Sequence, residues 1–132
     1  MRQRVAGSRT EWRPARLIAI VTGVGICAGC AGAPTRVVQG GDPQRGRRAM
    51  VQYGCGSCHV IPGIPRAVGR VGPPLGGFAG RTYIAGEIPN TADNLIRWIR
   101  VPQEVEPRTA MLNLGVDEQS ARDIAAYLYT RP

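Results

Sequence analysis

The sequence of 132 residues contains no lysine, one histidine (His59) and few aromatic residues: two tryptophans, four tyrosines and one phenylalanine. A single histidine excludes every site that needs two histidine ligands. No alternating apolar–polar run is long enough to predict a β-strand. Glycine (18 residues) and proline (11 residues) are abundant instead. A short chain of this composition buries a modest core, so we expect it to need a crosslink or a bound cofactor.

Positive charge is concentrated at the N-terminus. All 17 basic residues are arginines, against nine acidic residues, and the formal net charge is +8. Five of these arginines and one acidic residue fall within residues 1–29, and the other 12 arginines and eight acidic residues leave +4. A nucleic-acid-binding domain usually has a basic stripe of its own, outside any charged leader. Half of the net charge here lies in residues 1–29, so we predict no nucleic-acid partner.

The N-terminal 29 residues have the layout of an export signal. Residues 1–16 are arginine-rich, residues 17–29 are apolar and uncharged, and Cys30 follows. The segment resembles a bacterial lipoprotein signal, although Cys27 stands where a leucine is usual, and the resemblance implies lipid attachment to Cys30. The alternatives are an uncleaved anchor helix and a soluble protein. The apolar run from Leu17 to Ala33 has 17 residues, which approaches the roughly 20 that span a bilayer. Each reading places the rest of the chain outside the cytoplasm, and we expect a periplasmic, membrane-tethered protein of the bacterial cell envelope.

The remaining chain divides into a linker and one domain. Residues 30–41 are small, polar and aperiodic, and are predicted to form a flexible tether, while residues 42–132 are predicted to fold as one domain. Capping residues followed by apolar residues at helical spacing predict three helices, which begin at Asp42, Thr91 and Asp117, with Pro102 ending the second. The predicted fold class is all-α, with three or more helices and long Gly/Pro-rich loops.

A long loop separates the first two predicted helices. Residues 54–90 number 37, of which nine are glycine and five are proline. A structureless loop of this length inside a compact domain is normally evidence against the assignment. The exception is a loop that wraps around a group the polypeptide does not supply. The loop therefore predicts a large bound cofactor.

Within this loop, residues 55–59 read CGSCH, the signature of c-type haem attachment. Two cysteines three apart reach the two vinyl groups along one haem edge and form thioether bonds. The next residue, the single histidine of the chain, then places its imidazole under the iron. We predict one haem c, attached through Cys55 and Cys58, with His59 as an axial ligand.

Three other interpretations of these residues are weaker. A thioredoxin-like pair belongs at a strand-to-helix junction, which the surrounding sequence does not predict. A zinc site needs four ligands, and the domain supplies three, of which the adjacent Cys58 and His59 cannot readily face one ion. A structural Cys55–Cys58 disulfide is a third alternative, but it leaves His59 unexplained.

Electron transfer requires a second axial ligand, for which the domain offers two methionines. Met50 falls on the apolar face of the first helix, where packing in the core explains it. Met111 lies in a proline-rich, non-helical segment far from His59 in sequence, as a ligand on the opposite haem face should. A His–Met pair raises the reduction potential and favours electron transfer over catalysis. If Met111 is not a ligand, the open iron position predicts a haem-based ligand sensor or a peroxidase-like enzyme.

From Asp42 to Arg131 the chain resembles a class I cytochrome c. The ligand loop departs from the usual Pro-Gly-Thr-x-Met-Pro pattern, because Arg108 and Leu112 replace the glycine and the second proline. Two stretches, VIPGIPRAVGRVGPP and RTYIAGEIPNTADNLIRWI, are most similar to cytochrome c domains associated with bacterial haem–copper oxidases. The matching features, in chain order, are Gly46 in the first helix, CGSCH, Gly72-Pro73-Pro74-Leu75, Gly80-Arg81, a tryptophan-bearing helix, Pro107 to Met111, and a last helix with Tyr127.

The resemblance implies roles for several residues. The first and last helices would cross at Gly46, and the Pro73 carbonyl would accept a hydrogen bond from the second ring nitrogen of His59. Leu75 would line the haem face. The groups expected around the haem propionates are Arg81, Tyr83, Trp98 and Thr109.

These observations predict a monomeric electron carrier, not an enzyme. By resemblance, its donor would be a quinol-oxidising cytochrome complex and its acceptor a haem–copper terminal oxidase. The alternative is a stoichiometric haem subunit of an oxidase or dehydrogenase complex. The arginines that flank the attachment motif in sequence are predicted to form a basic rim for an acidic partner: Arg45, Arg47, Arg48, Arg66 and Arg70.

Overall fold

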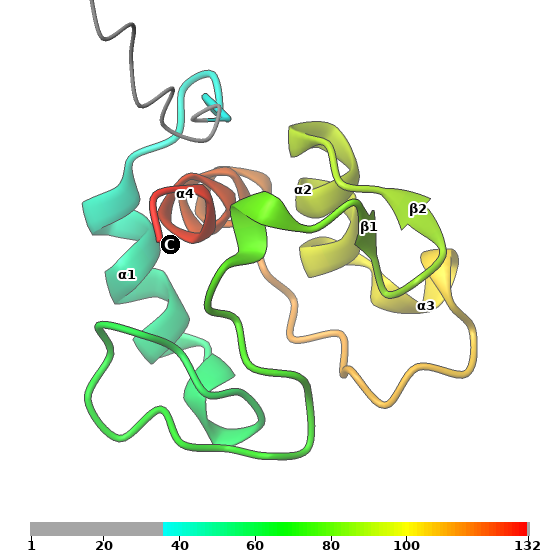
Figure 1. Cartoon of the computed structure of the whole chain (residues 1–132), viewed down its shortest axis with the longest axis horizontal. Helices are drawn as coiled ribbons and strands as arrows, with labels where there is room; N and C mark the ends of the chain where they lie inside the picture. Colours follow the sequence, from blue (N-terminus) through cyan, green and yellow to red (C-terminus); the bar gives the residue numbers. More distant parts are fainter. Residues whose placement is uncertain (1–35, 132) are drawn as a thin grey trace, which may run out of the picture. The chain divides into compact units, whose positions relative to one another are not determined.

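The structure is a computed structural model that describes residues 36–131. The predicted leader and Cys30 lie outside the described residues. Helices predominate, which confirms the all-α prediction (Figure 1). The elements, in chain order, are α1 (Pro43–Gln52), the 3₁₀ turns η1 (Cys55–Ser57) and η2 (Phe78–Gly80), strands β1 (Tyr83–Ile84) and β2 (Ile88–Pro89), then α2 (Ala92–Arg100), α3 (Pro102–Val105) and α4 (Glu118–Tyr129).

Helices α1 and α4 pack closely, and the sequence shows why. The Asp42 side chain caps α1 by accepting hydrogen bonds from the first backbone N–H groups, and Pro43 occupies the first helical position. Gly46 faces α4, where a Cβ would lie 2.0 Å from the carbonyl oxygen of Asp123. Glycine is therefore required at this crossing, as the family resemblance implies.

Helices α2 and α4 supply most of the remaining core. Thr91 caps α2 through its hydroxyl, and the Asp117 carboxylate caps α4 by accepting from the N–H of Ser120. The buried face of α2 consists of Leu95, Ile96 and Ile99, and that of α4 runs from Ala121 to Tyr129. The sequence predicted both helices because the caps and the apolar spacing are local signals.

Two elements differ from the prediction. Helix α2 ends at Arg100, and Pro102 opens the short helix α3 instead of only ending α2, since proline suits the first turn of a helix. Strands β1 and β2 form a hairpin of two residues each, too short for any alternation to show. At its turn, Ala85 and Gly86 both have positive φ, as a type I′ turn requires.

Residues 36–41, which we call the strap, pack against α4 rather than forming the flexible tether that the sequence predicted. Val38 is buried, and Gly41 lies so close to Ala126 that a Cβ would come within 2.8 Å of its methyl group. The Gly40 carbonyl accepts a hydrogen bond of 2.9 Å from Gln119. The segment looked like a tether because its few apolar residues have no period of their own.

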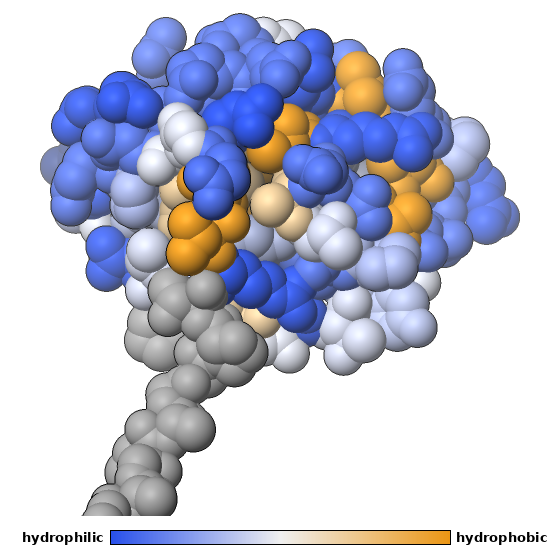
Figure 2. All heavy atoms as spheres, turned by 90° about the horizontal axis from the view of Figure 1, so that it is seen from above, coloured by the Kyte–Doolittle hydropathy of each residue, from blue (hydrophilic) through white to orange (hydrophobic). Residues whose placement is uncertain are grey.

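The surface seen from the top of Figure 1 is largely hydrophilic, with apolar side chains in small separate patches (Figure 2). Within residues 36–131, no helix combines the length and the apolar character needed to cross a bilayer.

Candidate haem site

The attachment motif follows directly from the end of α1. Gly54 adopts a left-handed conformation (φ +70°) and turns the chain into η1. The N–H groups of Cys58 and His59 both donate to the Cys55 carbonyl, at 3.3 and 3.1 Å. This tight turn brings both thiols and the imidazole to one cavity. Both thiols are free, and burial raises the pKa of the Cys55 thiol.

His59 is oriented by a backbone carbonyl. Its Nδ1 lies 2.7 Å from the carbonyl oxygen of Pro73, and because a carbonyl only accepts, Nδ1 must carry the proton. The lone pair of Nε2 is then available for a metal. Gly72 permits this contact, since a Cβ there would lie 2.2 Å from Cε1 of the ring. The predicted hydrogen bond between His59 and Pro73 is thus present in the structure.

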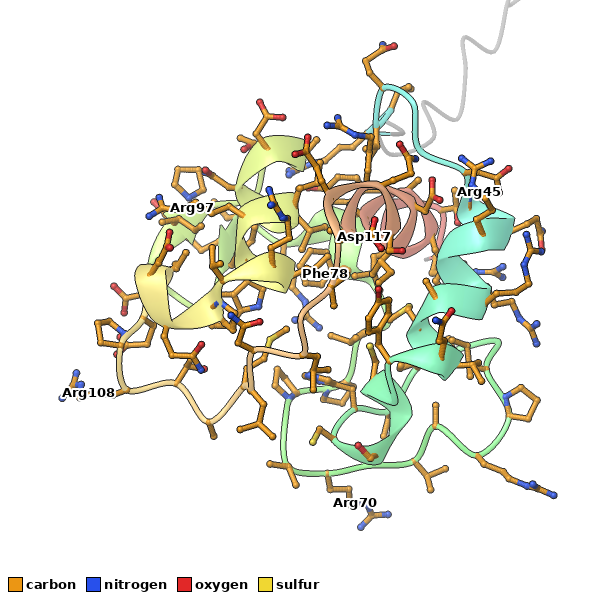
Figure 3. All side chains as sticks on the ribbon, turned by 180° about the vertical axis from the view of Figure 1, so that it is seen from behind. Arg45, Arg70, Phe78, Arg97, Arg108 and Asp117 are labelled. Carbon is orange, nitrogen blue, oxygen red and sulfur yellow. The ribbon has the colours of Figure 1, made fainter. Side chains whose placement is uncertain are left out.

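One cavity of about 650 Å³ brings together every site residue that the sequence predicted within residues 36–131. Its volume is typical of cofactor sites, and apolar side chains such as Phe78, Ile84 and Leu95 form most of its wall. Phe78 lies in the interior of the molecule, below α4 (Figure 3). The predicted residues that line the cavity are Cys55, Cys58, His59, Pro73, Leu75, Arg81, Tyr83, Trp98, Thr109 and Met111.

Met111 reaches the cavity from the loop that joins α3 to α4, whereas His59 belongs to the turn after α1 (Figure 1). Its backbone is fixed at two points. The Met111 N–H donates to the Thr109 hydroxyl (3.1 Å), and the Gln103 side chain donates to the Met111 carbonyl (2.7 Å). Met50 also lines the cavity, but it is buried on the inner face of α1 as core packing predicts.

Arg81 places an uncompensated positive charge at the cavity. Its guanidinium donates to the carbonyls of Pro74 and Gly76 and lies 4.9 Å from the centre of the Phe78 ring. Among residues 36–131, no carboxylate forms an ion pair with it. A half-buried cation beside an apolar cavity favours a ligand that carries anionic groups.

The residues present therefore fit a haem. Two thiols, a correctly protonated imidazole, apolar walls and an unpaired cation meet at one cavity. The zinc alternative is not supported, because the described part of the chain contains no cluster of three or more His, Cys, Asp or Glu side chains that could hold a metal. The thioredoxin alternative also fails, because the CxxC follows a helix and not a strand.

The predicted basic rim does not surround this cavity, since none of its five arginines lines it. Arg45 instead binds Asp123, with Nε 2.7 Å from Oδ2, and Arg47 donates to the Gly63 carbonyl. Four large apolar side chains that line the cavity are exposed to solvent. We call this group the apolar rim, formed by Val71, Tyr83, Leu112 and Leu114. The sequence does not predict this rim, because exposed apolar residues in loops have no periodicity.

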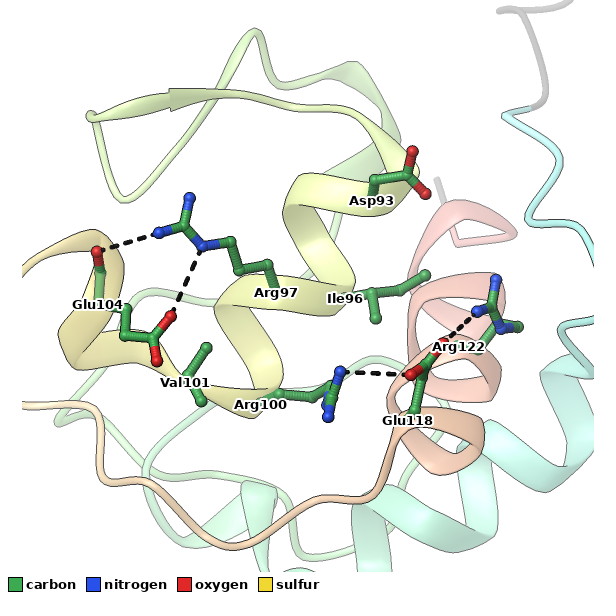
Figure 4. Close-up of a pocket in the computed structure, with 8 residues that line it drawn as sticks. All are labelled: Asp93, Ile96, Arg97, Arg100, Val101, Glu104, Glu118 and Arg122. Carbon is green, nitrogen blue, oxygen red and sulfur yellow. Dashed lines mark hydrogen bonds and ion pairs between the residues drawn. The ribbon is translucent and has the colours of Figure 1, made fainter.

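A second cavity of about 420 Å³ lies between α2, α3 and α4 and contains none of the predicted site residues (Figure 4). Its walls are ion-paired: Arg97 contacts Glu104, while Glu118 contacts both Arg100 (3.4 Å) and Arg122 (2.7 Å). Three arginines and three acidic residues compensate one another there. This charged, open cavity does not suit an apolar cofactor.

The fold and the site together define a small all-α protein built around a covalently attached prosthetic group. A family model described as cytochrome c matches residues 43–131. The chain belongs to the cytochrome c family.

Two relatives agree with this assignment. The chain is 32% identical over 85 residues to cytochrome c oxidase subunit 2 of Alkalihalophilus pseudofirmus, a match that covers 64% of this chain but only 24%, about a quarter, of that protein. Cytochrome c2 of Rhodobacter sphaeroides is similar in structure, with a TM-score of 0.51 and 25% identity over 69% of this chain and 96% of that one. These findings confirm the prediction of a class I cytochrome c, a family of electron-transfer proteins, with haem c as the cofactor.

Proposed function

We propose that this protein is a membrane-tethered monohaem cytochrome c that passes single electrons to a haem–copper oxidase on the periplasmic side of a bacterial envelope. The observation that supports this best is the meeting of four groups at one cavity: the thiols of Cys55 and Cys58, the imidazole of His59 and the thioether of Met111. When bound there, haem c supplies an iron that gains and loses one electron. A quinol-oxidising cytochrome complex is the proposed donor.

His59 and Met111 would hold the haem iron. The Pro73 carbonyl holds the imidazole in the protonation state and orientation that ligation requires. The two hydrogen bonds to the Met111 backbone keep the ligand loop in place. A fixed thioether raises the reduction potential and prevents small molecules from binding the iron. Both effects suit an electron carrier better than a sensor or a peroxidase.

Other cavity residues are proposed to hold the propionates and the ring. Arg81 supplies a positive charge that no carboxylate of residues 36–131 pairs with, and Leu75 is buried against the cavity. An ion pair between a haem propionate and the Arg81 guanidinium would offset the cost of placing both charges beside apolar walls. The polar groups that complete this set are Tyr83, Trp98 and Thr109.

The apolar rim is the proposed docking surface for redox partners. Its side chains are exposed, with Val71 at 72% and Leu112 at 67%, and they border the cavity that holds the haem. Arg70 and Arg108, each close in sequence to a rim residue, are exposed and project outward from the molecule (Figure 3). This composition suits a partner with an apolar contact surface and a few acidic residues at its edge. Such encounters bury little area and dissociate quickly.

Two observations support the proposed oxidase acceptor and the proposed membrane tether. A relative of this chain is a subunit of cytochrome c oxidase, and the N-terminal 30 residues have the pattern of a lipoprotein signal ending at Cys30. The same relative also favours the second candidate, in which this protein is a permanent haem subunit of such a complex. An uncleaved anchor helix would serve the same tethering function as a lipid.

The test uses the full-length protein, purified in detergent and reduced, then mixed with a haem–copper oxidase solubilised from the same membranes. We expect oxidation of the haem, followed by its absorbance, to depend on the oxidase. Leu112→Asp should slow it about tenfold or more, because desolvating an unpaired charge in an interface costs over 1.4 kcal/mol. Arg48→Gln is the matched control and should leave the rate unchanged, since Arg48 is exposed away from the cavity.

Oxidation that proceeds equally without oxidase would contradict the proposed acceptor. A Leu112→Asp rate equal to that of the unmodified protein would remove the apolar rim as the docking surface. Equimolar co-purification of the two proteins through detergent and high salt would favour the permanent-subunit alternative.

A further inference from the structure

A buried polar pair connects α4 to the turn that carries Arg81. Asn90 and Tyr129 are 4% and 3% exposed, and neither lines the haem cavity. The Tyr129 hydroxyl donates to Oδ1 of Asn90 at 2.8 Å. Buried polar groups of this kind are costly unless every hydrogen bond is made, so they hold their surroundings in one arrangement.

The amide nitrogen of Asn90 uses both of its hydrogens on one segment. Nδ2 donates to the carbonyls of Phe78 (2.9 Å) and Arg81 (3.0 Å), and the backbone N–H of Asn90 donates to the Thr82 carbonyl (2.9 Å). Three carbonyls of residues 78–82 are thus held by one residue. The Phe78 and Tyr129 rings also pack against each other, with centroids 6.2 Å apart.

The consequence of this anchoring appears at the cavity. With residues 78–82 fixed, the Arg81 guanidinium lies over the Phe78 ring and within reach of the Pro74 and Gly76 carbonyls. The strap contributes from outside, where Arg36 lies 5.7 Å from the centre of the Tyr129 ring and 3.5 Å from the Arg81 carbonyl oxygen. The strap precedes residues 43–131, the part of the chain that the family model matches.

We infer that Asn90, held by Tyr129, is a positioning residue that keeps the Arg81 charge at the haem cavity. Neither residue lines the haem cavity, and the contacts described above connect them to it through residues 78–82. The inference rests on the role proposed for Arg81. A cation held near the iron favours the reduced, less positive state, so releasing Arg81 lowers the reduction potential.

The test compares two single-hydroxyl changes on the same helix. Tyr129→Phe removes the hydrogen bond to Asn90, and Tyr127→Phe removes one of equal length, 2.8 Å, to the Pro62 carbonyl on a different loop. The readout is the reduction potential of the full-length holoprotein, with thermal unfolding measured alongside. We expect Tyr129→Phe to lower the reduced-to-oxidised ratio at a fixed ambient potential about threefold or more, where tenfold equals 59 mV. Tyr127→Phe should lose comparable stability without changing that ratio.

A double-mutant cycle shows whether the effect passes through Arg81. We expect Arg81→Gln to lower the potential, and Tyr129→Phe to have no further effect in that background. Equal shifts from both tyrosine variants, or a Tyr129→Phe shift that persists beside Arg81→Gln, would overturn the inference. An Arg81→Gln variant with an unchanged potential would instead remove the proposed role of Arg81. Should Tyr129→Phe fail to fold, Arg36→Gln probes the same turn, and its shift must likewise vanish beside Arg81→Gln.

Discussion

Two glycines allow the close backbone contacts that position the haem site. Gly46 allows the backbones of α1 and α4 to touch, and Gly72 allows the loop to lie against the His59 ring. The attachment motif follows α1 directly, so the α1–α4 contact also determines where both thiols lie. The sequence predicted Gly46 and Gly72 through the family resemblance. Their physical requirement, the missing Cβ, becomes visible only in the structure.

Gly46→Ala is expected to destabilise the protein by about 1–3 kcal/mol, the usual cost of overpacking. The added Cβ would lie 2.0 Å from the Asp123 carbonyl oxygen, so the helices must separate. Urea unfolding of the oxidised holoprotein measures the change. Gly80→Ala is the matched control, since a Cβ there meets no atom within 4 Å. Equal unfolding midpoints for both variants would show that close contact between α1 and α4 does not contribute to the stability of the protein.

At the scale of secondary structure, the elements with local signals were predicted and the others were not. Asp42, Thr91 and Asp117 cap the three helices whose starts the sequence predicted. Helix α3 and the hairpin were missed because they are too short to show a period. The strap was missed because its contacts are with distant residues of α4. The same holds for Asn90, a polar residue in a loop whose partners lie on η2, Arg81 and α4.

The cap of α4 predicts a pH dependence. The hydroxyl and N–H of Ser120 donate to Asp117 and lower the pKa of its carboxyl from 3.8 to about 2. Because the folded pKa lies below the unfolded one, this contribution is complete above pH 3.8 and is lost as the pH falls through about 2. Asp117→Asn keeps an acceptor but removes the charge. Its urea midpoint should therefore lie below that of the unmodified protein at pH 6, with the gap closing towards pH 2. A gap independent of pH would contradict this account.

At the scale of the whole molecule, the strap shortens the linker between Cys30 and the folded domain. A flexible tether over residues 31–41 would span up to about 40 Å, whereas residues 31–35 alone span at most about 18 Å. A lipid on Cys30 would then keep the haem domain near the membrane surface. That restriction favours a partner in the same membrane over long-range shuttling.

The residues that meet at the cavity were predictable because haem attachment depends on residue types at fixed spacing. Cys55, Cys58 and His59 follow from the motif, and Met111 follows from the few methionines available. The proposed docking surface was not predicted, because the arginines near the motif in sequence do not line the cavity and Arg45 is bound to Asp123.

The central claim is that a haem c held by His59 and Met111 carries electrons, and an optical spectrum tests it most directly. The full-length protein, made with a c-type haem maturation system, is reduced and recorded before and after carbon monoxide is added. The account predicts a low-spin c-type spectrum that carbon monoxide leaves unchanged, because Met111 occupies the sixth position. A strong shift with carbon monoxide would show an open iron site and contradict the electron-carrier proposal in favour of a sensor or an enzyme.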